Sequence, residues 1–247
     1  MYRHLLLIVL ALAFHAPQLL QAETPDGFVS LFDGKTFAGW KVPEGDNGHW
    51  KIVEGVIDYD ASSEAPDDKN LWTEREYGNF VLLVDWRIKD TPYVNPRVPV
   101  VKPDGTHKLG ADGKEIRTSV PDSDSGIFLR GEGKSQVNIW CWPIGSGEVY
   151  GYRMDKEMTA EVRAGVTPKT NADNNIGEWN TFELTISGDR LSVKLNGQQV
   201  LKNAQLPRIP SRGPIALQHH GGKDEDGNWR SPPALVQFRN IAIKELD

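Results

Sequence analysis

Alternation of apolar and polar residues with a period of two is the strongest structural signal in this chain. In residues 80–88, FVLLVDWRI, large apolar side chains occupy alternate positions, at Phe80, Leu82, Val84 and Trp86. Residues 127–130, 137–142 and 215–220 alternate in the same way. A period of two is the side-chain period of a β-strand, in which successive residues point to opposite faces of a sheet. We therefore expect strands that pack around a hydrophobic core. The core side chains we expect are Ile127, Leu129, Ile139 and Leu217.

Turn signals separate the strand-like runs. Glu54-Gly55, Ser187-Gly188-Asp189 and Asn196-Gly197 are each flanked by apolar runs, a pattern typical of β-hairpins. After residue 22 no amphipathic stretch of helical length appears, and MDKEMTAEV predicts a helical turn at most. Many short strands predict an all-β fold, an antiparallel β-sandwich or jelly roll. No linker-like segment divides residues 23–247, so we expect a single domain.

The N-terminal segment 1–22 has the pattern of a secretory signal peptide. Arg3 and His4 precede the apolar run Leu5–Phe14, and Ala22 ends a plausible cleavage region. The run is too short to span a membrane. We expect cleavage after Ala22 and export to the periplasm or beyond, with no membrane attachment afterwards. An uncleaved anchor is the alternative.

Composition narrows the possible partners. The net charge of -6 argues against nucleic acid or an anionic membrane as a partner. Cys141 is the one cysteine, so no internal disulfide forms, which is compatible with a bacterial periplasm. The eight tryptophans favour carbohydrate as a ligand in an exported β protein.

Motif searches exclude several enzyme classes. The chain has no G-x-S-x-G, no H-E-x-x-H and no Walker loop. Gly131-Glu132-Gly133 begins like a dinucleotide loop, but Gln136 stands in place of the third glycine. We therefore expect neither NAD nor FAD as a cofactor.

Residues 122–153 carry an unusual mixture opposite their apolar set. Asn138, Trp140 and Trp142 alternate with Val137, Ile139 and Cys141, and Arg130 follows Leu129. Tryptophan is costly to leave in water, whereas Arg and Asn are costly to bury unpaired. A sheet face that binds a sugar accommodates both, because indoles stack on sugar C–H groups and polar side chains bond hydroxyls. Ordinary sandwich packing with one satisfied arginine is the alternative.

Further polar residues alternate with apolar ones, and we expect them to share one sheet face: Asp85, Arg87, Arg130, Asn138, Glu148, Tyr150, Gln218 and His220. For Asp85 and Arg87 an ion pair on a solvated face is the alternative, and for Glu148 a solvated loop. Of His219 and His220, one is expected to turn to the core or to bond the backbone, and the other to act as a base, because imidazole titrates near neutrality. Residues 91–123, rich in Pro, Gly, Asp and Lys, predict a long loop that covers a site or projects from the surface.

Five segments, taken in order, resemble one known family: GFVSLFDGKTFAGW, LWTEREYGNFVLLVDWR, SDSGIFLRG, IGEWNTFELTISGDRLSVKLNGQQV and GPIALQHHG with ALVQFRNIAIKEL. This is the 3-keto-disaccharide hydrolase domain family, also described as 3-keto-glucoside 1,2-lyase/3-keto-2-hydroxy-glucal hydratase. The resemblance covers nearly all of residues 23–247. It implies a concanavalin A-like β-sandwich and an enzyme that acts on glycosidic bonds.

The resemblance also implies a mechanism. A base removes the C2 proton of a 3-keto sugar, the enolate expels the glycosidic oxygen, and water can then add to the unsaturated product. In this chain Arg130 and Arg87 suit the enolate, and His220, His219 or Glu148 suit the base and the acid. The catalytic set we expect is Arg130, Glu148, His220, His219 and Asp85. The substrate-binding residues are Arg87, Asn138, Trp140, Trp142, Tyr150 and Gln218. A divalent metal held by Asp85, Glu148 and His220 is an alternative to the arginine.

The substrate implied is an oxidised, 3-keto carbohydrate, which a separate sugar 3-dehydrogenase would supply. Two other functions remain open at this point. One is a lectin-like sugar-binding module without catalysis, because the same fold serves both. The other is a direct glycosidase with Asp85 and Glu148 as paired carboxylates.

Overall fold

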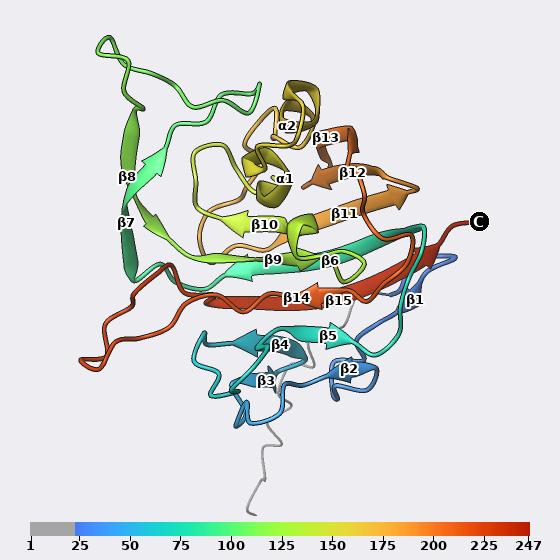
Figure 1. The fold of residues 1–247 in the computed structure, drawn as a ribbon. Helices are drawn as coiled ribbons and strands as arrows, with labels where there is room; N and C mark the ends of the chain where they lie inside the picture. The colour runs from blue at the N-terminus through green and yellow to red at the C-terminus, as the bar shows by residue number, and fades with distance from the viewer. Residues whose placement is uncertain (1–22) are drawn as a thin grey trace, which may run out of the picture.

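Two antiparallel β-sheets pack against each other in the computed structural model, which describes residues 23–247 (Figure 1). The larger sheet has eight strands. Seven follow one another in this order: β13 (Gln198–Gln205), β12 (Arg190–Leu195), β11 (Asn180–Ser187), β6 (Phe80–Ile88), β15 (Val236–Glu245), β4 (Val56–Tyr59) and β3 (Trp50–Val53). The eighth, β1 (Val29–Ser30), pairs with β15. The expected signal peptide lies outside the described residues.

The smaller sheet has five strands, in this order: β10 (Val137–Trp140), β9 (Asp124–Phe128), β14 (Ala216–Leu217), β5 (Leu71–Thr73) and β2 (Trp40–Lys41). Its register sets which residues lie side by side. Trp140 is the Cα partner of Asp124, and Leu217 is the partner of Ile127. This sheet lies over the larger one, and the apolar residues between the two form one continuous core.

The core confirms the alternation seen in the sequence. In β6 every second residue from Phe80 to Ile88 is buried. All four residues expected in the core are fully buried: Ile127, Leu129, Ile139 and Leu217. Each buried Leu or Ile contributes roughly 1.5–3 kcal/mol relative to exposure, and so the inward faces hold the two sheets together. The antiparallel sandwich predicted from the sequence is confirmed.

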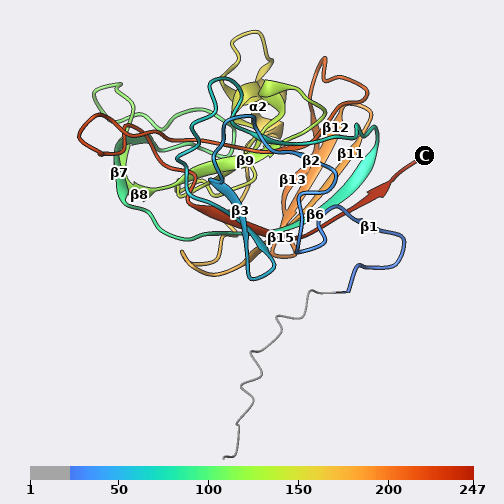
Figure 2. The same cartoon turned by 90° about the horizontal axis from the view of Figure 1, so that it is seen from below.

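Residues 91–123 are not the irregular loop that their composition predicts. They form a two-stranded ribbon of β7 (Tyr93–Pro99) and β8 (Arg117–Asp122), with a register shift between Asn95 and Val98. Proline is tolerated here because both strands are edges and need no second ladder of hydrogen bonds. The ribbon stands at one end of the sandwich, away from the C-terminus (Figures 1 and 2).

Helical structure is limited to short segments. These are η1 (Gly133–Ser135), α1 (Tyr150–Met154) and α2 (Ala160–Gly165), the last capped by the Thr159 hydroxyl, which accepts from the Val162 amide at 3.3 Å. The helical turn expected near residues 154–162 is therefore present. Within residues 23–247, no helix has the length and apolar character needed to cross a membrane.

Candidate active site

The outer face of the five-stranded sheet carries the exposed polar and aromatic residues of this half of the molecule. Ile127 and Leu217 point into the core, so their neighbours point outward. Trp72 of β5 stacks on Phe128 of β9 with 5.8 Å between ring centroids. The Gln136 side chain crosses the face to donate to the Gln218 Oε1. A Cβ at Gly126 would lie within 3 Å of Gln136, so glycine makes room for this crossing.

The sheet register brings His220 beside Asp124. Leu217 pairs with Ile127, and the Gln218 amide donates to the Gly126 carbonyl at 2.9 Å. Continuing this antiparallel register places His220 opposite Asp124. Residues directly opposite one another have Cβ atoms roughly 4.5–5.5 Å apart. The two side chains therefore lie on the same side of the sheet, near enough for the charge of His220 to lower the pKa of Asp124, with no hydrogen bond or ion pair between them.

His220 is held in one tautomer. Its Nδ1 lies 2.6 Å from the Pro232 carbonyl oxygen, which can only accept a hydrogen bond. Nδ1 therefore carries the proton, and in the neutral ring the Nε2 lone pair is available. The Ala234 amide donates to the His220 carbonyl at 2.9 Å and fixes the backbone. The ring is thus fixed by the hydrogen bond that Nδ1–H donates to Pro232, and Nε2 on its other edge can accept a proton.

Asp124 is the group that sequence reasoning missed. Its half-buried carboxyl has no hydrogen-bond partner among residues 23–247. Burial raises the pKa of Asp124 to about 7, although the attraction of His220 lowers it and the charge of Asp122 raises it further. Asp124 alternates with Gly126 and Phe128, so extending the outward set back along the strand would have found it. Near neutral pH it can hold a proton and release it.

Asp122, two residues before Asp124, has a different role because its oxygens are occupied. They accept hydrogen bonds from the Cys141 amide (3.2 Å), Asn95 Nδ2 (3.0 Å) and Trp142 Nε1 (3.1 Å). These bonds tie the β7–β8 ribbon to the end of β10. Asp122 therefore fixes the position of the strand on which Asp124 lies.

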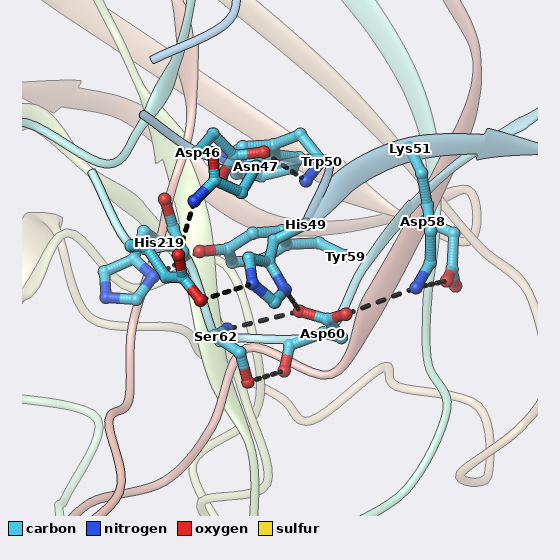
Figure 3. A network of polar contacts seen from close by, with 12 residues as sticks. Asp46, Asn47, His49, Trp50, Lys51, Asp58, Tyr59, Asp60, Ser62 and His219 are labelled. Atoms are coloured by element: carbon cyan, nitrogen blue, oxygen red, sulfur yellow. Dashed lines mark hydrogen bonds and ion pairs between the residues drawn. The ribbon is translucent and has the colours of Figure 1, made fainter. Parts of the chain in front are cut away.

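His219 points the opposite way, as expected for one of the two histidines. Its Nδ1 lies 2.5 Å from the Tyr59 hydroxyl of β4, in the larger sheet (Figure 3). Burial, with the charge of Lys69, lowers the pKa of His219 to about 4. A second histidine in the same region, His49, bonds Asp60 at 2.9 Å. His219 is thus a neutral interior group and does not lie on the outer face.

Glu148 lies on the outer side of the sheet but is covered. The Asn138 amide donates to the Glu148 carbonyl at 2.9 Å, and Gly147 bonds Asn138 in return at 2.8 Å. A Cβ at Gly147 would meet Val200 of the larger sheet, so Gly147 faces the core and Glu148 faces outward. The Glu148 carboxyl is fully buried against the Arg153 guanidinium. The solvated loop carboxylate considered from the sequence is therefore wrong.

Arg153 extends this pair toward the ribbon. Its Nη1 bonds His107 Nε2 at 3.1 Å, and His107 Nδ1 bonds Glu115 at 2.7 Å. Burial raises the pKa of Glu148, and the charge of Arg153 opposes that rise. The guanidinium holds Glu148 through Oε1, while Oε2 is buried without a partner, so the carboxyl is closed off from a substrate on the outer face.

Arg130 is not on the outer face, contrary to the prediction. Strand β9 ends at Phe128, and Arg130 has a left-handed backbone with φ of 53°, so the alternation stops before it. The side chain is 2% exposed. Its guanidinium donates to the carbonyls of Gly78 (2.8 Å), Gly188 (2.7 Å) and Pro210 (3.0 Å) and to Asn79 Oδ1 (3.1 Å). It joins loops together, as in the alternative of sandwich packing with one satisfied arginine.

Asp85 and Arg87 lie on the outer face of the larger sheet, and so they do not share a face with His220. Asp85 accepts from Thr181 Oγ1 and Asn240 Nδ2, both at 2.7 Å. Arg87 donates to Gln237 at 2.6 Å and lies over the Trp179 ring. Alternation predicts which residues share a face of one strand, but not which sheet the strand joins. The two residues form polar networks of their own and do not pair with each other.

The expected metal ligands are not brought together either. Asp85 lies on one sheet, Glu148 is paired with Arg153, and His220 lies on the other sheet. Within the described part of the chain, no group of three His, Cys, Asp or Glu side chains is arranged to hold a metal ion.

The two tryptophans after Ile139 stack on each other. Trp140 and Trp142 are parallel with 4.1 Å between centroids, and Tyr150 meets both edge-on. Trp140 is only 3% exposed and donates to the Gly145 carbonyl at 2.8 Å, so its ring cannot serve as an open sugar platform. Trp142 is half-buried and Tyr150 is exposed. Asn138 is buried, which leaves Gln218 as the accessible amide of the predicted set.

Comparison with known proteins decides the family. Residues 27–244 match the 3-keto-alpha-glucoside-1,2-lyase-like domain. This chain belongs to that family. The resemblance drawn from the five sequence segments is thereby confirmed, and the matched residues include every strand from β1 to β14 and most of β15.

Relatives of this family member agree in fold. A 3-keto-disaccharide hydrolase of Bacteroides thetaiotaomicron is 32% identical over 69 residues, which are 26% of this chain and 24% of that protein. A crystal structure named "putative glycosyl hydrolase" from Parabacteroides distasonis superposes with a TM-score of 0.57 at 20% identity, over 90% of this chain and 85% of that one. A second from the same organism gives 0.52 at 20% identity, over 90% and 94%. These structures share the sandwich fold.

Proposed function

We propose that this protein cleaves 3-keto-glycosides, with His220 as the base that removes the C2 proton and Asp124 as the acid that protonates the leaving oxygen. Membership of the 3-keto-alpha-glucoside-1,2-lyase-like family supports the substrate class. The observation that carries the assignment of residues is the meeting of an oriented imidazole with an unpartnered, proton-holding carboxyl on one sheet face.

The chemistry of a 3-keto sugar requires such a pair. The C3 carbonyl acidifies the C2 hydrogen, because the electron pair left behind is shared with the carbonyl oxygen. His220 Nε2 takes this proton, and the Pro232 carbonyl then stabilises the imidazolium through Nδ1–H. The C1–O bond breaks as C1=C2 forms, and Asp124 donates its proton to the departing oxygen. Each positioned acid or base contributes roughly 10²–10⁴ in rate.

The products are an alcohol and a 3-keto-2-hydroxy-glucal. Hydration of this glucal runs through the same groups in reverse roles. Deprotonated Asp124 activates a water for addition at C1, and the His220 imidazolium returns a proton to C2. Both residues then regain their starting protonation states, so the net reaction is hydrolysis.

Other residues on the face suit binding of the sugar ring. Gln218 accepts through Oε1 from Gln136, and its Nε2 has no hydrogen-bond partner within the described chain. This amide is available to donate to the developing oxyanion at O3. Trp72, which is half-buried and stacks on the buried Phe128, offers an aromatic surface beside it for the C–H face of the sugar.

Incubation with matched substrates tests the proposal. The pure protein is given a 3-keto-glucoside or its unoxidised parent, with and without a chelator, and the products are followed by mass. We expect cleavage of the oxidised glucoside alone, and its loss in His220→Ala. Cleavage of the unoxidised parent would indicate a direct glycosidase, and binding without turnover would indicate a sugar-binding module. Inhibition by the chelator would indicate a metal-dependent reaction.

The direct glycosidase has less structural support. Its paired carboxylates are far apart in the fold, because Asp85 lies on the larger sheet and Glu148 lies in the segment between β10 and α1, where Arg153 closes it off. The proposed reaction instead needs a substrate already oxidised at C3. A separate sugar 3-dehydrogenase is therefore the partner activity that we propose upstream.

A further inference from the structure

We propose that a cavity at one end of the sandwich is a second ligand site, which takes a small neutral polyol the size of one sugar ring. The cavity has a volume of about 300 Å³ and lies between the two sheets. Trp86 and Asn180, which are Cα partners on β6 and β11, form its floor from the larger sheet. Trp142 and Asp173 complete it from the side of the smaller sheet.

The floor presents hydrogen-bond donors that nothing in the described chain satisfies. Trp86 is 1% exposed, and its indole Nε1 is buried without an acceptor. Asn180 is 2% exposed and accepts through Oδ1 from the Asn174 amide (2.8 Å) and Asn196 Nδ2 (2.7 Å). Its own Nδ2 has no partner among residues 23–247. A buried donor without an acceptor costs free energy, so the Trp86 indole beside this cavity indicates a missing acceptor, and Asn180 Nδ2 offers a second donor next to it.

The same cavity presents an unsatisfied acceptor. Asp173 accepts from the Ser146 amide through Oδ2 at 2.8 Å, but its Oδ1 is buried and unpartnered. A ligand that fits must therefore accept from an indole and an amide and also donate to a carboxyl oxygen. Neighbouring hydroxyl groups do both, because each is a donor and an acceptor. A simple ammonium ion offers no acceptor to Trp86, and an anion would be repelled by Asp173.

The mouth of the cavity is formed by exposed residues on a turn. Asn174 and Ile176 line it, and Ile176 is 48% exposed. The Asn174 side chain is held by one bond to the Trp179 carbonyl at 2.9 Å. Because the floor atoms of Trp86 and Asp173 are shielded in the free protein, we expect these mouth side chains to shift as a ligand enters. The indole face of Trp142 then lies against the ring.

This site does not contain the proposed catalytic pair, although Trp140, the Cα partner of Asp124, lines its wall. Asp124 and His220 project from the outer face of the smaller sheet, whereas Trp86 and Asn180 project inward from the larger one. The inference does not depend on the proposed reaction. A variant that abolishes catalysis should therefore retain the second site.

The indole N–H resonance of Trp86 gives a direct test. The resonance is assigned by its absence in Trp86→Phe, and the protein is titrated with D-glucose in two-dimensional ¹H–¹⁵N spectra. We expect this resonance to shift in a saturable way, and Asp173→Asn to weaken the affinity by about tenfold, the loss expected for one buried hydrogen bond. Absence of a shift up to high millimolar glucose would overturn the proposal and leave water as the occupant.

Three variants and one other ligand serve as controls for this test. Asp46→Asn changes another buried aspartate with one unpartnered oxygen, which lies outside the cavity, and should leave the affinity unchanged. Ile176→Trp alters only an exposed position and should block entry even if Asp173→Asn fails to fold. His220→Ala should bind glucose as the wild type does, and loss of binding there would overturn a separate site. A saturable shift with methylammonium in place of glucose would overturn the polyol assignment.

Discussion

Arg130 and Asp124 lie close together in the sequence, yet they illustrate opposite uses of a charged group. Arg130 is buried with its donors shared among three carbonyls and one amide oxygen. Asp124 is half-buried with no hydrogen bond in the described chain and a raised pKa. A buried polar group that is fully satisfied holds loops in place, whereas an unsatisfied one costs stability and is a candidate for function. Asp124 is therefore the residue that we propose for the chemistry, and Arg130 is a structural one.

The largest effect should come from the outer face. His220→Ala removes the proposed base, and we expect kcat on a 3-keto-glucoside to fall by roughly 10²–10⁴. The free energy of unfolding should change little, because the ring is partly exposed and makes one side-chain hydrogen bond. Steady-state kinetics and thermal unfolding on the same preparation check this. A kcat near that of the wild type would remove His220 from the mechanism.

Arg130→Met should show the opposite profile. It leaves several buried oxygens without donors, so we expect the free energy of unfolding to drop by about 3 kcal/mol or more. The kcat of the folded fraction should stay within a few-fold of wild type. Denaturant unfolding and active-site titration measure the two quantities. A stable variant with a hundredfold lower kcat would place Arg130 in the chemistry and break the comparison.

Asp124→Asn should separate stability from activity through pH. The folded-state pKa of about 7 lies above the ordinary value of 3.8, so the folded protein binds more protons between pH 4 and 7. The free energy of unfolding of the wild type therefore falls as pH rises through that window. The variant lacks this loss, and we expect it to be more stable by roughly 1–3 kcal/mol at pH 8 but equal at pH 4, after allowing for solvent screening. Activity should fall strongly. Equal stability at both pH values would contradict the raised pKa.

The smallest effect should come from the interior histidine. Tyr59→Phe removes the hydroxyl that bonds His219, and we expect a loss of about 1 kcal/mol in the free energy of unfolding. Turnover should be unchanged, because His219 points away from the outer face. Chemical denaturation and kinetics provide the check, and a marked loss of kcat would show that His219 supports the catalytic pair.

The fold was predictable because burial alternates wherever a strand continues. Ile127, Leu129, Ile139 and Leu217 were identified as core from pattern alone, and all are fully buried. The β7–β8 ribbon was missed because proline argues against strands, and only its edge position makes Pro96 and Pro99 acceptable. Alternation in the sequence therefore predicts interior strands of a sheet better than edge strands such as β7 and β8.

The site was only partly predictable. His220 and Gln218 were placed correctly on an outer face because their strand is regular up to that point. Arg130 was misplaced because β9 ends two residues before it, and Asp85 because its strand joins the other sheet. The raised pKa of Asp124 arises from burial and from Asp122 and His220, groups that only the tertiary structure brings near it. Strand ends and sheet assignment are tertiary properties that alternation does not encode.

Isotope incorporation tests the central claim most directly. Wild-type protein is given a 3-keto-glucoside in D₂O, and the reducing sugar product is examined by NMR and mass against an enzyme-free incubation of the same product. Abstraction of the C2 proton by His220, followed by hydration, predicts one solvent-derived deuterium at C2 of each product molecule. A C2 that stays fully protonated, together with no primary kinetic isotope effect for the C2-deuterated substrate, would contradict elimination and with it the role of His220 as the base.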